Sequence, residues 1–132
     1  MNQELVMRKY MANLAILFVV AFGCMAQQMP KIVVDIPFQF EADRNLVPAG
    51  TYELQPNGEG THIELHNMKT HERYIASVLT SLASRESNQS VVAFDVEGQN
   101  HYLSEVHIAG IDGFALRGTT GKHTHITIQA KK

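Results

Sequence analysis

Seven of the 132 residues are histidines, and their spacing makes them the main candidates for metal binding in this sequence. In an extended strand, residues two positions apart share a face and lie about 6–7 Å apart. His123 and His125 therefore point to the same side, and so do His62, Glu64 and His66. Imidazole and carboxylate groups are ligands for zinc, copper or nickel. One hypothesis is therefore a histidine-dependent metal-binding protein that uses zinc or copper, with His62, His66, His123 and His125 as candidate ligands.

The competing interpretation requires no cofactor. It places the histidines on the solvent-facing sides of half-buried strands, opposite inward apolar residues, among them Ile63, Leu65, Ile126 and Ile128. No HExxH or paired CxxC motif strengthens the metal hypothesis, so it remains the alternative.

Catalytic motifs are absent from the sequence. There is no GxSxG nucleophile elbow, no GxGxxG and no P-loop. Asp95 and Glu97 fall on one face of a predicted strand, as an acid pair would, but a solvated strand edge near a turn also explains them. We therefore predict a protein that is not an enzyme.

The first 26 residues have the features of a secretory signal peptide. Arg8 and Lys9 form a short positive region, and the 13 residues 14–26 are apolar without a break. That run is too short to span a bilayer, which takes about 20 residues. Cleavage after Ala26 would leave one domain, residues 27–132, without a membrane span, in a secreted or periplasmic location.

Cys24 is the only cysteine, so no disulfide can form within the chain. A lipoprotein signal is the alternative processing, in which Cys24 becomes an acylated first residue and the domain is a lipid-anchored envelope protein. Gly23 fits that signal and Phe22 fits it poorly, which favours the cut after Ala26. The true start is open among Met1, Met7 and Met11.

Beyond residue 26, apolar and polar residues alternate over short runs bounded by turn residues, which is the period of half-buried strands. The sequence predicts an all-β fold: a single small antiparallel β-sandwich or barrel of about seven strands, after the signal-peptide helix. The predicted strands lie within residues 35–41, 51–55, 61–67, 71–80, 91–97, 101–110 and 123–130.

Turn residues refine this prediction. Pro37 cannot donate to a sheet ladder, so its strand should be bulged or at an edge. Asn57-Gly58 favours a tight hairpin. Gly98, Gln99 and Asn100 should join two strands as a hairpin. The polar, serine-rich residues 81–90 should form the loosest loop.

The segment "VDIPFQFEADRNLVPAGTYEL" at residues 34–54 resembles a family of small, secreted, functionally uncharacterised bacterial β proteins with an IPFxF … LPAGxY pattern. Val47 stands where leucine is usual. "HYLS" at 101–104 and "ITIQAKK" at 126–132 are similar to later strands of that family, whereas residues 109–122 depart from it. The resemblance implies a β fold and export, and it supplies no activity, cofactor or catalytic residue.

Net charge is −2 with histidine neutral, so nothing indicates a nucleic-acid-binding surface. The leading functional hypothesis is an exported, non-catalytic β module that binds or scaffolds in the cell envelope or outside the cell. A protein or a glycan is its expected ligand. Neither that ligand nor the oligomeric state follows from the sequence.

Overall fold

The computed structural model describes residues 29–132, which form strands and turns with no helix among them. The predicted all-β class is confirmed. No segment of the described chain makes an apolar helix of the length that crosses a membrane. The predicted signal peptide, the cleavage at Ala26 and the alternative lipidation at Cys24 lie outside the described residues.

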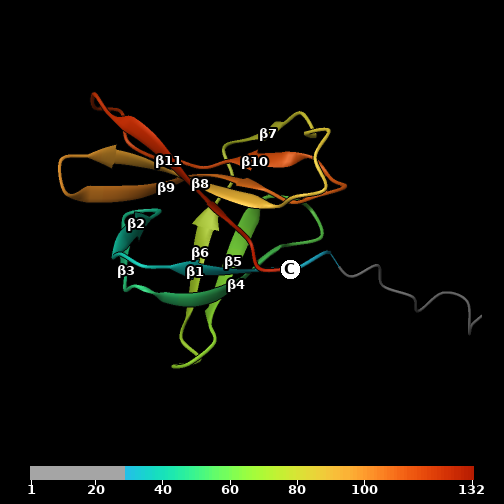
Figure 1. Cartoon of the computed structure of the whole chain (residues 1–132), viewed down its shortest axis with the longest axis horizontal. Helices are drawn as coiled ribbons and strands as arrows, with labels where there is room; N and C mark the ends of the chain where they lie inside the picture. The colour runs from blue at the N-terminus through green and yellow to red at the C-terminus, as the bar shows by residue number, and fades with distance from the viewer. Residues whose placement is uncertain (1–28) are drawn as a thin grey trace, which may run out of the picture.

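The strands form two sheets, which appear as two layers in Figure 1. The first sheet has the order β1 (Ile32–Ile36), β4 (Gly50–Pro56), β5 (His62–Asn67), β6 (Arg73–Ser77). The second has the order β11 (Thr124–Gln129), β8 (Val91–Glu97), β9 (Asn100–His107), β10 (Gly113–Ala115), β7 (Thr80–Leu82). A short hairpin of β2 (Phe40–Ala42) and β3 (Asn45–Val47) joins the second sheet beside β9.

The described residues contain eleven strands, where the sequence predicts about seven. Six of the seven strands of five residues or more are predicted ones, and the seventh, β1, overlaps the predicted strand 35–41 only at its last two residues. The other four, β2, β3, β7 and β10, have three residues each and too few alternating positions to stand out from turns. Pairing is antiparallel throughout, as predicted, except between β2 and β9, which pair in parallel.

One apolar core holds the two sheets together. Its side chains come from alternate positions of the longer strands, and the predicted inward residues Tyr52, Leu54, Ile63 and Leu65 are fully buried. Phe40 of the second sheet and Tyr52 of the first meet edge to face, with ring centroids 5.9 Å apart. Such aromatic pairs add about 0.5–1.5 kcal/mol to the free energy of area burial.

Pro37 marks where the chain passes from one sheet to the other. Residues 35–41, predicted as one strand, are divided at Pro37–Gln39 into the end of β1 and the start of β2. Strand β1 lies at the edge of the first sheet, in agreement with the edge expected from proline. A residue without a backbone N–H suits this break because it has no ladder hydrogen bond to lose.

The predicted hairpin of β8 and β9 is confirmed, and it turns at Gly98-Gln99. Its register shifts between Ala93 and Phe94, which pair with Glu105 and Leu103 and leave Ser104 as the extra residue of a bulge. The Ser104 hydroxyl donates to the Ala93 carbonyl at 3.1 Å. Bulges re-aim side chains and are frequent beside binding sites.

Strand β11 lies at the edge of the second sheet, and this position corrects one prediction. Ile126, expected to point inward, is 36% exposed, although Ile128 packs against the core as expected. Only β8 pairs with β11, so the alternating pattern of this strand is only partly covered.

The phenol of Tyr74 on β6 donates a hydrogen bond to the Glu72 carboxylate at 2.6 Å. This bond to the neutral phenol, with a smaller effect of burial, raises the pKa of Tyr74 to about 12. Because the folded-state pKa lies above the ordinary value of 10.0, the contact stabilises the fold fully below that value. Its contribution is lost as the pH rises toward 12.

We predict that Glu72→Gln moves the titration of Tyr74 down toward the ordinary range, since the charge that opposes phenolate formation is gone. Carbon-13 NMR of labelled tyrosine, assigned with Tyr74→Phe, measures the midpoint. Glu59→Gln, which changes an exposed glutamate in the β4–β5 turn, is the control and should leave it unchanged. An unchanged midpoint in Glu72→Gln would contradict the assignment.

Candidate metal centre

The register of β8 and β11 brings an acid and two histidines together. Asp95 on β8 pairs directly with His125 on β11. Cross-strand partners project from the same face of a sheet, so these two side chains meet. His123 lies just before β11, two residues from His125 and on the same side. One ligand atom from each of the three residues lies within 4.8 Å of the others.

Asp95 is the buried member of this cluster. The residue is 5% exposed, which corrects the expectation of a solvated strand edge. Its Oδ2 atom accepts a hydrogen bond from the Thr119 backbone N–H at 3.0 Å. Its Oδ1 atom is buried and has no hydrogen-bond partner among the described residues. A buried carboxylate oxygen without a partner is costly unless a cation or a donor compensates it.

His123 presents a ring nitrogen to that oxygen. Its Nδ1 lies 2.6 Å from the Gly121 carbonyl, which can only accept, so Nδ1 carries the proton and donates. In the neutral ring the other nitrogen, Nε2, then has a free lone pair, and it lies 3.5 Å from Asp95 Oδ1. A hydrogen bond that fixes the tautomer and orientation in this way is typical of metal-binding histidines.

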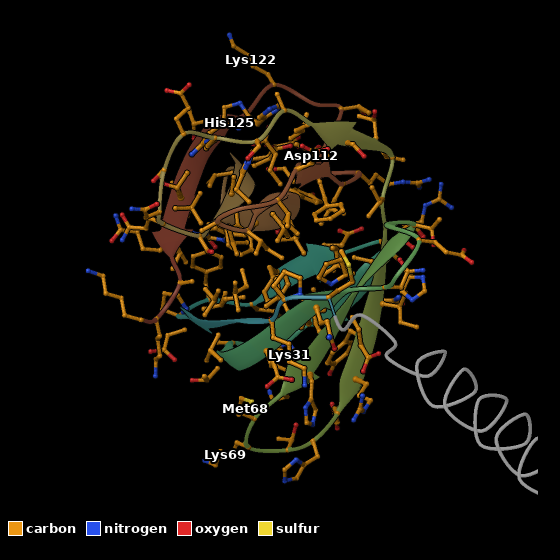
Figure 2. All side chains as sticks on the ribbon, turned by 90° about the vertical axis from the view of Figure 1, so that its right-hand side faces the viewer. Lys31, Met68, Lys69, Asp112, Lys122 and His125 are labelled. Atoms are coloured by element: carbon orange, nitrogen blue, oxygen red, sulfur yellow. The ribbon has the colours of Figure 1, made fainter. Side chains whose placement is uncertain are left out.

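His125 completes the cluster from the solvent side. Its Nδ1 lies 2.9 Å from Asp95 Oδ1, which is ion-pair distance for a protonated ring, although the contact is not a hydrogen bond. The two imidazole rings meet edge to face, with centroids 4.7 Å apart. The His125 side chain is 67% exposed, and Figure 2 places it at the end of the molecule opposite Met68 and Lys69.

The spacing of these atoms suits a small divalent ion. Zinc binds histidine nitrogen and carboxylate oxygen at about 2.1 Å, so two tetrahedral ligands lie about 3.4 Å apart. The His123 Nε2 to Asp95 Oδ1 distance of 3.5 Å matches that value. The His125 Nδ1 to Asp95 Oδ1 distance of 2.9 Å is shorter, and rotation of the exposed His125 ring can lengthen it.

The segment 116–123 holds the cluster against the sheet. It begins with the Leu116 N–H donating to the Ser104 carbonyl in the bulge of β9. Thr119 then contacts both acids of β8, with its N–H on Asp95 and its hydroxyl on Glu97 at 2.9 Å. Asp95 and Glu97 do share a face, as predicted, and Thr119 bridges them.

Gly118 allows this segment to approach Asp95. Its φ is +57°, in the left-handed region, and a Cβ atom there would overlap the Asp95 Oδ2 atom and crowd Ser104. A side chain at this position is therefore excluded by both backbone conformation and space.

The other predicted ligands lie elsewhere. His62 and His66 are on β5, in the first sheet, and do not join His123 and His125. The Arg73 guanidinium pairs with Glu64, between them in the sequence, and the His66 ring lies 5.5 Å from that of His71. On β9, Glu105 and His107 share a face as predicted, with Glu105 Oε2 2.8 Å from His107 Nε2.

Sequence reasoning did not include Asp95 among the metal ligands. Pairing the two predicted strands 91–97 and 123–130 in the observed register would have identified Asp95, because that register places His125 opposite it. Comparison with protein-family models, with curated proteins and with solved structures found no match.

We predict that Gly118→Ala destabilises the protein more than Gly98→Ala. Both glycines have φ near +60°, so both substitutions incur a backbone penalty of about 1–2 kcal/mol. A Cβ atom meets nothing within 4 Å at Gly98, whereas at Gly118 it overlaps Asp95. Urea unfolding measures the difference. Equal losses in the two variants would show that the 116–123 segment does not depend on close approach to Asp95.

Proposed function

We propose that this domain binds one divalent transition-metal ion, zinc or copper, through Asp95, His123 and His125. The observation that carries the proposal is the buried Oδ1 atom of Asp95, which has no hydrogen-bond partner within residues 29–132, while imidazole nitrogens of two histidines lie 2.9 and 3.5 Å from it. A cation at that point compensates the buried charge and accepts both nitrogen lone pairs. This proposal takes up the alternative sequence hypothesis of a histidine-dependent metal-binding protein, in place of the expected protein or glycan ligand.

The donor set favours zinc or copper over magnesium or calcium. Two imidazoles and one carboxylate match the ligands that zinc and copper take in proteins, whereas magnesium and calcium prefer oxygen ligands alone. For divalent ions of the first transition row, affinity rises to copper and then falls to zinc. We expect both ions to bind, and copper more tightly.

We further propose that the domain is a non-catalytic β-sandwich module exported from the cell, secreted or periplasmic. This is supported by the basic and apolar sequence of residues 1–26 and by the lack of a catalytic motif. The resemblance to small secreted β proteins points the same way. In this setting the module holds its metal by nitrogen and oxygen ligands and carries out no reaction of its own.

The metal proposal is tested by titrating protein purified after expression of the full chain. We expect one zinc or copper ion per chain at micromolar concentration by isothermal titration calorimetry. Asp95→Asn, His123→Ala and His125→Ala each remove a ligand, so each should weaken binding at least about 10–100-fold, the loss seen even for outer-shell partners. His62→Ala and His66→Ala are matched controls from the other sheet and should leave the affinity unchanged.

Two results would exclude this centre. One is the lack of stoichiometric metal binding in the unaltered protein. The other is an equal loss of affinity in His62→Ala and His123→Ala. Far-ultraviolet circular dichroism of each variant checks that a lost affinity does not come from a lost fold.

Export is tested separately by intact-mass analysis of the protein released from the cell. We expect a mature chain that begins at Gln27, after a cut that follows Ala26. A chain that begins at an acylated Cys24 would replace the soluble form with a lipid-anchored one. A chain in the cytoplasm that retains residues 1–26 would refute export.

A further inference from the structure

We propose that the metal held by Asp95, His123 and His125 keeps one coordination position open, and that this position takes a small anion, such as a carboxylate, from outside the chain. This inference rests on the proposed metal function and states what the bound metal does. Its basis is the number of donors in the cluster, the side from which solvent reaches it, and its charge.

The donor count leaves the coordination incomplete. Among the described residues, the cluster offers one ligand atom from each of three side chains. Structural zinc sites are closed by four protein ligands, whereas the zinc sites of enzymes have three and keep a fourth position for water or substrate. The same donor count leaves an exchangeable position in a protein that carries out no reaction. Three donors in this chain therefore correspond to a site with an exchangeable ligand.

Glu97 is the nearest acid along β8, and it is already engaged. Its Oε2 atom accepts the Thr119 hydroxyl at 2.9 Å, and it is not one of the three residues whose ligand atoms gather within 4.8 Å. Thr119 thus holds Glu97 beside the cluster as a neighbour of the metal.

The open side faces the sheet edge. The Oδ1 atom of Asp95 is shielded from solvent, so β8 and the 116–123 segment close the inner side of the cluster. The His125 side chain is 67% exposed on β11, beyond which no strand of the described chain pairs. Figure 2 places His125 and Lys122 at the same end of the molecule. A ligand therefore enters from the β11 edge.

Charge then selects the class of ligand. A divalent ion together with one carboxylate and two neutral imidazoles has a net charge of +1. An anion neutralises that charge. The neighbouring Glu97 carboxylate opposes an anion, and the exposed side chains of Arg117 and Lys122 on the segment that flanks the cluster offset that repulsion. Small carboxylates combine that charge with the oxygen donor that these metals accept.

Cobalt(II) in place of zinc gives the test, because its visible absorption responds to coordination number and ligand type. The full-chain protein is first titrated with cobalt(II), and then with sodium azide or sodium acetate as the anion probe. We expect saturable changes in the visible bands, with half-saturation at millimolar anion. Cobalt(II) in buffer without protein, given the same anions, is the control.

The outcomes separate the two proposals. If neither cobalt(II) nor zinc binds, the metal function itself is wrong. If one cobalt(II) ion binds per chain and neither anion alters its spectrum, the metal function stands and the open position is refuted. Glu97→Gln refines the second result: a spectral response to azide in this variant alone would assign the fourth position to Glu97.

Discussion

The buried carboxylate of Asp95 is the constraint around which the candidate site is built. Removing an ionised carboxylate from water costs several kcal/mol unless hydrogen bonds or a cation compensate it. Thr119 supplies a backbone N–H to one oxygen, and Gly118 has no Cβ, so the backbone can come close enough for that bond. Within the part of the chain that the structure describes, the polar side chains near the other oxygen are those of His123 and His125. A metal therefore fits at Oδ1, the carboxylate oxygen that receives no hydrogen bond from the backbone.

This constraint also explains features of the second sheet that contribute little to the apolar core, namely the bulge in β9, the segment 116–123 and strand β11. The bulge at Ser104 offers a carbonyl to Leu116, and the chain from there to His123 crosses the outer face of β8. Strand β11 is mostly exposed, yet its register with β8 sets His125 opposite Asp95. A shift of one residue in that register would turn His125 to the other face and separate the pair. The register of an edge strand therefore determines the chemistry of the site.

The fold was predictable where periodicity is local. Six of the seven longer strands follow from alternation, and Gly98 marks the β8–β9 turn, because each signal lies within a few neighbouring residues. Short strands and the passage between sheets at Pro37 depend on contacts between distant segments. The exposure of Ile126 has the same origin, since only the strand order places β11 at an edge. The two histidines of the site were predictable from their spacing. Asp95 was not, because the sequence of one strand does not determine which residue of another strand pairs with it.

The processing of the N-terminus bears on which metal chemistry is available. A cut after Ala26 removes Cys24, and acylation converts its thiol to a thioether, so both expected routes leave the domain without a free thiol. Thiolate ligands, which favour copper(I), would then be absent, and the three residues of the cluster offer nitrogen and oxygen donors. Those donors hold zinc and copper(II), the oxidised form of copper and the one suited to an oxidising compartment. Export and the composition of the site thus lead to the same prediction, although one comes from residues 1–26 and the other from the pairing of β8 with β11.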